Sequence, residues 1–166
     1  MQLSFSLGLS FMASTAFGAA ISVREDNPVP ANYCCFHLQD TISGKHVQQD
    51  TNTGELFLHD PSLKEGWYCI NQNSGSKILY DRDYNACILT SPNNSFECLD
   101  GTPGGDTWAI GPYVSGTVLL QDYGSIEFNI CNVKGRQQIY GANPPSGLSC
   151  QKTQLNTDNR TGQCKW

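Results

Sequence analysis

The chain has 166 residues with ten basic and fifteen acidic side chains, which gives a formal net charge of −5 at pH 7. Because it is acidic and has no cluster of lysine and arginine, we expect neither a nucleic-acid partner nor an anionic membrane surface as a partner. Charged residues are 15% of the chain, against about 25% in typical globular proteins, and polar positions hold Asn, Gln, Ser, Thr and Gly instead. This composition is typical of an extracellular surface.

The first twenty residues are uncharged, largely apolar, and end in the small residues Gly18, Ala19 and Ala20. Such a stretch indicates a secretory signal peptide over residues 1–20, with a mature chain that starts near Ile21. Ser and Gly interrupt it too often for a comfortable membrane span, and no second apolar run of that length follows. We therefore expect a secreted protein, extracellular or in a cell wall, with no membrane span.

Residues 21–32, with two prolines, predict an irregular N-terminal segment, and residues 33–166 predict one β-rich domain. Strands recurring about every ten residues, separated by Gly, Asn, Ser and Pro turns, are typical of an antiparallel sandwich or barrel. The fold class expected is therefore all-β: a single antiparallel β-sandwich or barrel of short strands, stapled by disulfides, with no helix beyond the signal peptide. The predicted strands are 35–38, 55–58, 67–70, 77–80, 86–89, 95–98, 107–110, 117–120, 126–130 and 138–140.

Eight cysteines follow the signal peptide, and an even number in an oxidising compartment predicts full pairing without a free thiol. Cysteine count alone leaves roughly one hundred pairings open. Short turns favour Cys87 with Cys98 and Cys131 with Cys150, which leaves four cysteines to tie the N-terminal segment and the C-terminus to the sheet. These four are Cys34, Cys35, Cys69 and Cys164. The spacing of the eight cysteines does not fit the Cys-x2–4-Cys knuckles of a zinc site, so we expect no metal.

Sequence motifs for catalysis are missing. No Gly-x-Ser-x-Gly elbow occurs, and none of the fifteen acids forms a privileged pair for glycoside hydrolysis. The histidines, His37, His46 and His59, have no neighbour in sequence that makes them base candidates, so a structural or surface role is expected. We therefore expect no enzyme activity and no cofactor.

Residues 81–85, Asp-Arg-Asp-Tyr-Asn, begin like a calcium loop with oxygen ligands at alternate positions. The sixth position is Ala86 where a sharp turn needs Gly, and the twelfth is Pro92 where a bidentate Glu belongs. This stretch therefore predicts an Asp-rich turn before a strand and not a calcium site.

Aromatic side chains offer the best candidates for a binding surface, since tyrosine rings can stack on sugars. Trp67 and Trp108 alternate with apolar residues and are expected in the core. The candidates for glycan contact lie in polar or Gly-rich surroundings and are Tyr84, Tyr113 and Tyr123. Two sequons predict N-glycosylation in surface turns, at Asn93 and at Asn159.

Several short motifs occur in a fixed order: Cys87-Ile88-Leu89-Thr90-x-Pro92, Ser95-Phe96-Glu97-Cys98-x-Asp100, Trp108-Ala109-Ile110, Phe128-x-x-Cys131, Ile139-Tyr140 and Cys150. Together they resemble the C-terminal domain of fungal PIR-type cell-wall proteins and the But-two C-terminal-like domains, with the phialide cell-wall protein as a looser relative. The upstream run 36–58 is similar to the start of those domains, so the resemblance extends from Cys35 to Cys150. It implies a fungal, non-enzymatic, β-rich wall or surface protein.

The glutamine-rich repeats through which PIR proteins become ester-linked to wall glucan are absent, which argues against that covalent attachment. Two functions fit the same compact scaffold: a wall-associated surface protein that contacts wall glycan, or a released effector that acts on an extracellular host target. A secreted glycan-active hydrolase is a third and weaker alternative. The sequence does not separate the first two.

Overall fold

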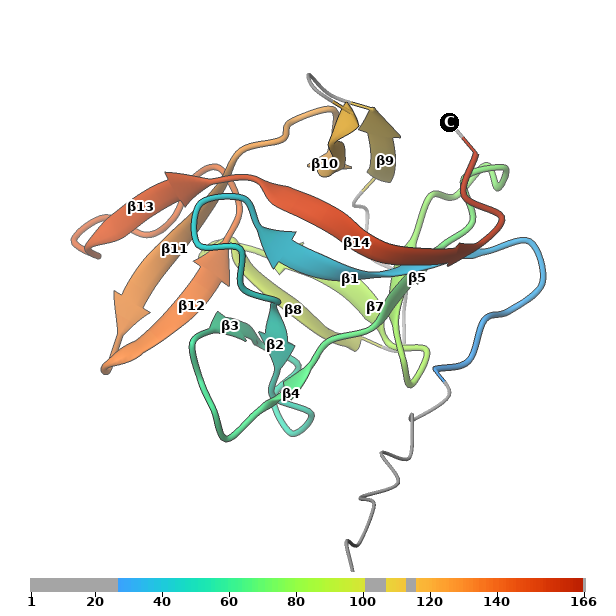
Figure 1. Cartoon of the computed structure of the whole chain (residues 1–166). Helices are drawn as coiled ribbons and strands as arrows, with labels where there is room; N and C mark the ends of the chain where they lie inside the picture. Colours follow the sequence, from blue (N-terminus) through green and yellow to red (C-terminus); the bar gives the residue numbers. More distant parts are fainter. Residues whose placement is uncertain (1–26, 101–106, 113–115, 166) are drawn as a thin grey trace, which may run out of the picture.

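The structure, a computed structural model, describes residues 27–100, 107–112 and 116–165 (Figure 1). The predicted signal peptide and the candidate Tyr113 lie outside the described residues. The strands, in chain order, are β1 (Cys34–Asp40), β2 (Gln48–Gln49), β3 (Leu56–Leu58), β4 (Lys64–Glu65), β5 (Tyr68–Ile70), β6 (Leu79–Asp81), β7 (Ala86–Thr90), β8 (Ser95–Asp100), β9 (Trp108–Pro112), β10 (Val118–Asp122), β11 (Phe128–Val133), β12 (Arg136–Tyr140), β13 (Cys150–Thr153) and β14 (Leu155–Gly162).

All of these strands belong to one antiparallel sheet. Its hydrogen-bonded order is β4-β2-β3-β12-β8-β7-β6-β5-β1-β14-β10-β9, and β11 joins through β12 and carries β13. The sheet curls into a half-barrel, with β1 and β14 running side by side across its middle (Figure 1). This confirms the all-β, antiparallel prediction, and the curl comes nearer to a barrel than to a sandwich. Within the described ranges there is no α-helix, and so no helix that could cross a membrane.

The longest strand, β14, is one that the apolar pattern failed to predict. Its sequence, LNTDNRTG, is polar, and only Leu155 and Thr157 are buried, at alternate positions. The strand pairs with β1, where a bulge lies between the partners of Cys35 and His37. Asn159 lies in that stretch with a φ of 50°, a backbone conformation that Asn tolerates better than most residues. The second sequon therefore lies on a bulged strand and not in a turn, contrary to the sequence prediction.

The main core fills the inside of the curl. Phe96 packs at its centre, with its ring stacked on those of Trp108 and Phe128 at centroid distances of 4.9 and 5.8 Å. The indole N–H of Trp108 donates to the carbonyl of Cys87 at 2.8 Å, so the fully buried ring leaves its polar atom paired. The predicted core position of Trp108 is confirmed.

A second, smaller cluster lies on the outer face of the sheet, because side chains alternate along β1. Cys34, Phe36 and Leu38 are buried in the main core, whereas the residues between them point the other way. We call this second group the outer cluster; it consists of Cys35, Trp67 and Cys69, with Tyr33 packed against it. Trp67 is buried as predicted, but in the outer cluster and not in the main core.

Four disulfides pair all eight cysteines, and no free thiol is left. Both predicted local pairs are confirmed, and each joins residues that lie directly opposite one another on neighbouring strands. The remaining bonds attach the start of β1 to the C-terminal segment and to β5. The pairs are Cys87–Cys98, Cys131–Cys150, Cys34–Cys164 and Cys35–Cys69.

Candidate functional site

Tyr84 sits at the tip of the tight turn between β6 and β7. Its φ is 64°, and its backbone N–H donates to the carbonyl of Asp81 at 3.2 Å. This left-handed conformation turns the chain back into β7, and the side chain is 60% exposed. The predicted exposure of Tyr84 is therefore confirmed.

The turn is built around the carboxylate of Asp81. It accepts hydrogen bonds from the backbone N–H groups of Asp83 and Asn85 at 2.9 and 2.8 Å, and from the side chain of Gln49 at 2.7 Å. With these donors the buried carboxylate is satisfied by the protein itself. Residues 81–85 thus form an Asp-rich turn, as predicted. The carboxylate of Asp81, the first ligand position of the calcium pattern, accepts hydrogen bonds from the protein instead.

Two further tyrosines, Tyr33 and Tyr80, lie beside Tyr84. The rings of Tyr33 and Tyr80 are 6.3 Å apart between centroids and tilted by 59°. Burial raises the pKa of Tyr33, and the nearby phenols of Tyr80 and Tyr84 raise it further. These rings border a crevice of about 10 Å³. It is too narrow to enclose a ligand, so a ligand would lie across the outer faces of the rings. We call this surface the tyrosine groove; it is lined by Pro28, Pro30, Tyr33, Cys69, Tyr80, Asp81, Arg82 and Tyr84.

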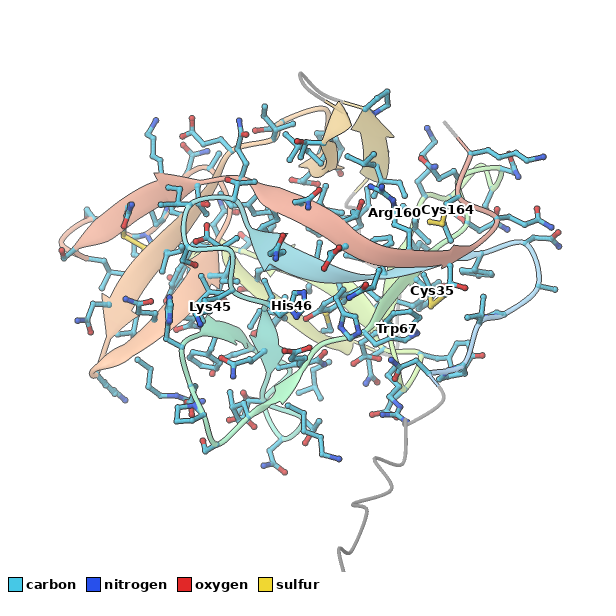
Figure 2. The ribbon with its side chains drawn as sticks, viewed as in Figure 1. Cys35, Lys45, His46, Trp67, Arg160 and Cys164 are labelled. Carbon is cyan, nitrogen blue, oxygen red and sulfur yellow. A yellow bond between two sulfur atoms is a disulfide. The ribbon has the colours of Figure 1, made fainter. Side chains whose placement is uncertain are left out.

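A wider hollow of about 280 Å³ continues from the tyrosine groove and shares Asp81 and Arg82 with it. Its other wall is the chain from β4 into β5, residues 64–67, where Figure 2 shows Trp67. We call it the polar hollow; it is lined by Gln49, Thr51, the segment 64–67 and the turn residues 81–83. Its volume is at the low end of the range for small-ligand sites.

Charges around the polar hollow are mixed and nearly balanced. Two cationic side chains, Lys64 and Arg82, face three carboxylates, Glu65, Asp81 and Asp83. Two cations and three carboxylates sum to −1, and Glu65 is paired with His46, so little net charge remains to attract an ion. The arrangement is suited to an uncharged ligand rich in hydroxyl groups, with rings for stacking at one end and hydrogen-bonding groups at the other.

Tyr123, the second described candidate, is also exposed, at 65%, and occupies the turn after β10. Its φ is 45° and its backbone N–H donates to the carbonyl of Thr107 at 3.0 Å. Tyr123 does not line the tyrosine groove or the polar hollow. The structure therefore brings Tyr84 together with Tyr33 and Tyr80, and it does not bring Tyr84 and Tyr123 together.

The histidines have partners that are distant in sequence. The ring of His46 lies 3.0 Å from both Glu65 and Asp158, and it stacks on His37 at 5.4 Å between centroids. His37 in turn donates from Nδ1 to the carbonyl of Gly66 at 2.7 Å. His59 is exposed, with a φ of 57°. The pairing of His46 was not predicted, because its partners follow it by nineteen and 112 positions.

The described part of the chain holds no group of three or more His, Cys, Asp or Glu side chains arranged to bind a metal ion. All eight sulfurs are in disulfides, so no thiolate nucleophile is present. The sequon residue Asn93 is exposed in the turn between β7 and β8, as expected, and Asn159 is exposed on β14.

A scan against protein-family models and searches of curated proteins and of solved structures find no match for this chain. The tyrosine groove and the polar hollow therefore carry the chemistry from which a function can be proposed.

Proposed function

We propose that this chain is a secreted, non-enzymatic protein of a fungal cell wall or cell surface, and that it contacts wall polysaccharide through the tyrosine groove. The observation that carries the glycan contact is the gathering of Tyr33, Tyr80 and Tyr84 in a groove that shares Asp81 and Arg82 with a polar hollow of little net charge. Tyrosine rings present flat apolar faces for the C–H faces of a sugar, and their hydroxyls remain available for hydrogen bonds.

Two further observations support this proposal. Four disulfides in a chain of 166 residues fit an oxidising environment outside the cell. The ordered motifs from Cys35 to Cys150 resemble wall and surface domains of fungi. The resemblance favours a structural or adhesive role over catalysis.

Retention of the oxidised chain on insoluble β-glucan and on chitin tests the glycan contact. We expect retention on at least one polymer, and we expect Tyr84→Ala to weaken it. If stacking on one ring is comparable to an aromatic pair, about 0.5–1.5 kcal/mol, the loss of affinity is roughly 2- to 10-fold.

Tyr123→Ala is the matched control, because both tyrosines are exposed turn residues with positive φ. Alanine carries a similar backbone cost at both sites, so melting temperatures should shift alike while retention changes only for Tyr84→Ala. Absence of retention of the unmodified protein on either polymer would refute the glycan contact. Turnover of a glycan or ester substrate by pure protein would refute the non-enzymatic assignment.

Separating a culture of the producing organism into wall and medium fractions tests the location independently of binding. We expect the protein in the wall fraction, released without cleavage of ester bonds. A protein found only in the medium, with transcripts raised on host colonisation, would favour the released effector instead.

A further inference from the structure

His46 lies between two carboxylates that come from separate strands. Its Nδ1 is 3.0 Å from an oxygen of Glu65 on β4, and its Nε2 is 3.0 Å from an oxygen of Asp158 on β14. Figure 2 shows His46 on the side of the sheet where β4 leads into β5 and Trp67. The ring therefore links the short β2–β4 layer to the long central strand of the half-barrel.

Both contacts need a proton on the ring nitrogen, because an ionised carboxylate only accepts hydrogen bonds. The geometry thus fits the doubly protonated imidazolium, which donates from both nitrogens. Burial lowers the pKa of His46, but the hydrogen bonds and charges of Asp158 and Glu65 raise it by more, so the pKa lies above the ordinary histidine value. The hydrogen bond from His46 also lowers the pKa of Asp158.

Other titratable groups face His46 from each element around it. His37 on β1 stacks on its ring, and a charge on His37 also favours ionised Asp158. Lys45 precedes it in the chain, and His59, from the loop after β3, lines the same surface hollow. The ring nitrogens of His46 themselves contact the carboxylates of Glu65 and Asp158.

The segment held by this contact is one wall of the polar hollow. Lys64, Glu65, Gly66 and Trp67 all line that hollow. The same segment is also fixed by the Gly66 N–H, which donates to the carbonyl of Val47, the residue after His46, at 2.9 Å. Trp67 meets the His37 ring edge-on at a centroid distance of 4.9 Å. His37 and His46 thus both contact the wall segment 64–67.

We propose that His46 is a positioning residue for the polar hollow: when doubly protonated, it ties β4 to β14 and holds the wall 64–67 in its binding arrangement, and the wall loosens when the ring loses a proton. The inference rests on the proposed function, because it concerns the same ligand site. Binding should therefore be strongest at mildly acidic pH, above the titration of Asp158 and below that of His46. It should weaken as the pH rises through the His46 pKa.

We call the contact of His46 with Glu65 and Asp158 the clamp. Histidine titration by NMR tests the clamp without any ligand. In the full oxidised chain we expect His46 to titrate above the ordinary value of about 6.5, and Asp158→Asn and Glu65→Gln each to lower that midpoint. His59→Gln is the matched control and should leave the His46 midpoint unchanged. A His46 midpoint at or below about 6.5, or one that neither carboxylate substitution moves, would overturn the proposal.

A second measurement addresses the wall and the ligand. Amide hydrogen exchange of residues 64–67 should speed up between about pH 5 and about pH 8, beyond the intrinsic base catalysis seen in other β-strands, and Asp158→Asn should remove that extra change. Asp158 is outside the hollow, so this variant leaves the lining side chains intact.

Retention on the polymer that binds should fall at least about 3-fold over the same range for the unmodified chain, and should stay flat for Asp158→Asn. If no polymer binds but the NMR and exchange results are as expected, the proposed function fails and the clamp stands. If a polymer binds with the same strength across the range in both proteins, the positioning role of His46 is wrong and the glycan contact stands.

Discussion

Removal of the Cys34–Cys164 disulfide should destabilise the protein more than removal of a disulfide that closes a short loop. The comparison is with Cys131–Cys150, because each bond joins one fully buried cysteine, Cys34 or Cys131, to a more exposed one. Changing both cysteines of a bond to alanine removes the same atoms in each variant. The closed loop differs, and Cys34 and Cys164 also pack in or against the main core whereas Cys150 is exposed, so the loss of packing acts in the same direction as the loop length.

The loop lengths set the expected magnitude. Cys131 and Cys150 are separated by 19 residues and Cys34 and Cys164 by 130, but the three other disulfides shorten the larger loop to about 70 residues. In the chain-entropy relation these lengths correspond to about 3.2 and about 4.4 kcal/mol at 25 °C. The Cys34→Ala, Cys164→Ala variant should thus lose about 1 kcal/mol more stability.

Denaturant unfolding of the two double variants and of the unmodified protein, with the remaining disulfides oxidised, gives both free energies. Alkylation and intact mass confirm that no new pairing has formed. Equal losses, or a larger loss for Cys131→Ala, Cys150→Ala, would refute the loop-entropy reasoning for this fold.

Two further predictions concern stability. Gly54→Ala should cost several times more than the control Gly135→Ala: both have positive φ, 74° and 82°, but a Cβ at Gly54 would lie 2.8 Å from the Cys98 backbone, whereas one at Gly135 meets nothing within 4 Å. Left-handed strain alone costs roughly 1 kcal/mol, so equal melting temperatures would contradict the clash. For Asp40, burial raises the pKa but hydrogen bonds from Ser43 and Thr153 lower it by more. The stabilisation from ionised Asp40 is therefore present above about pH 4 and is lost as the pH falls through its lowered pKa. In unfolding measurements, Asp40→Asn should make the free energy of unfolding depend less on pH in this acidic range.

Strands with an apolar alternation were predictable from the sequence, and strands without one were not. Ten expected runs correspond to β1, β3, and β5 through β12, with ends shifted by a few residues. The missed strands are β2, β4, β13 and β14. Their residues are largely polar or exposed, as in Lys64–Glu65 and Cys150–Thr153. Such strands are defined by pairing with distant segments, and this information is not local.

The candidate site was predictable only in part for the same reason. The exposure of Tyr84 followed from its polar turn, but the approach of Tyr33 depends on β1 pairing with β5, and β5 with β6. The partners of His46 likewise come from β4 and β14, two strands that the pattern missed. One local signal was available: Cys34 and Cys35 are adjacent on a strand, so they must face opposite sides and cannot serve the same cluster.

The alternation of side chains along β1 places Cys35 in the outer cluster. Cys35, Trp67 and Cys69 are too few to form a core of their own, yet they are buried on the outer face and held by a disulfide. The indole N–H of Trp67 donates to the carbonyl of Pro28 at 3.1 Å, which fixes the segment before β1 against β5. Pro28 and Tyr33 of that segment line the tyrosine groove, and Trp67 lines the polar hollow. The Cys35–Cys69 bond therefore contributes to the shape of the candidate site as well as to stability, which sets it apart from Cys131–Cys150 between β11 and β13.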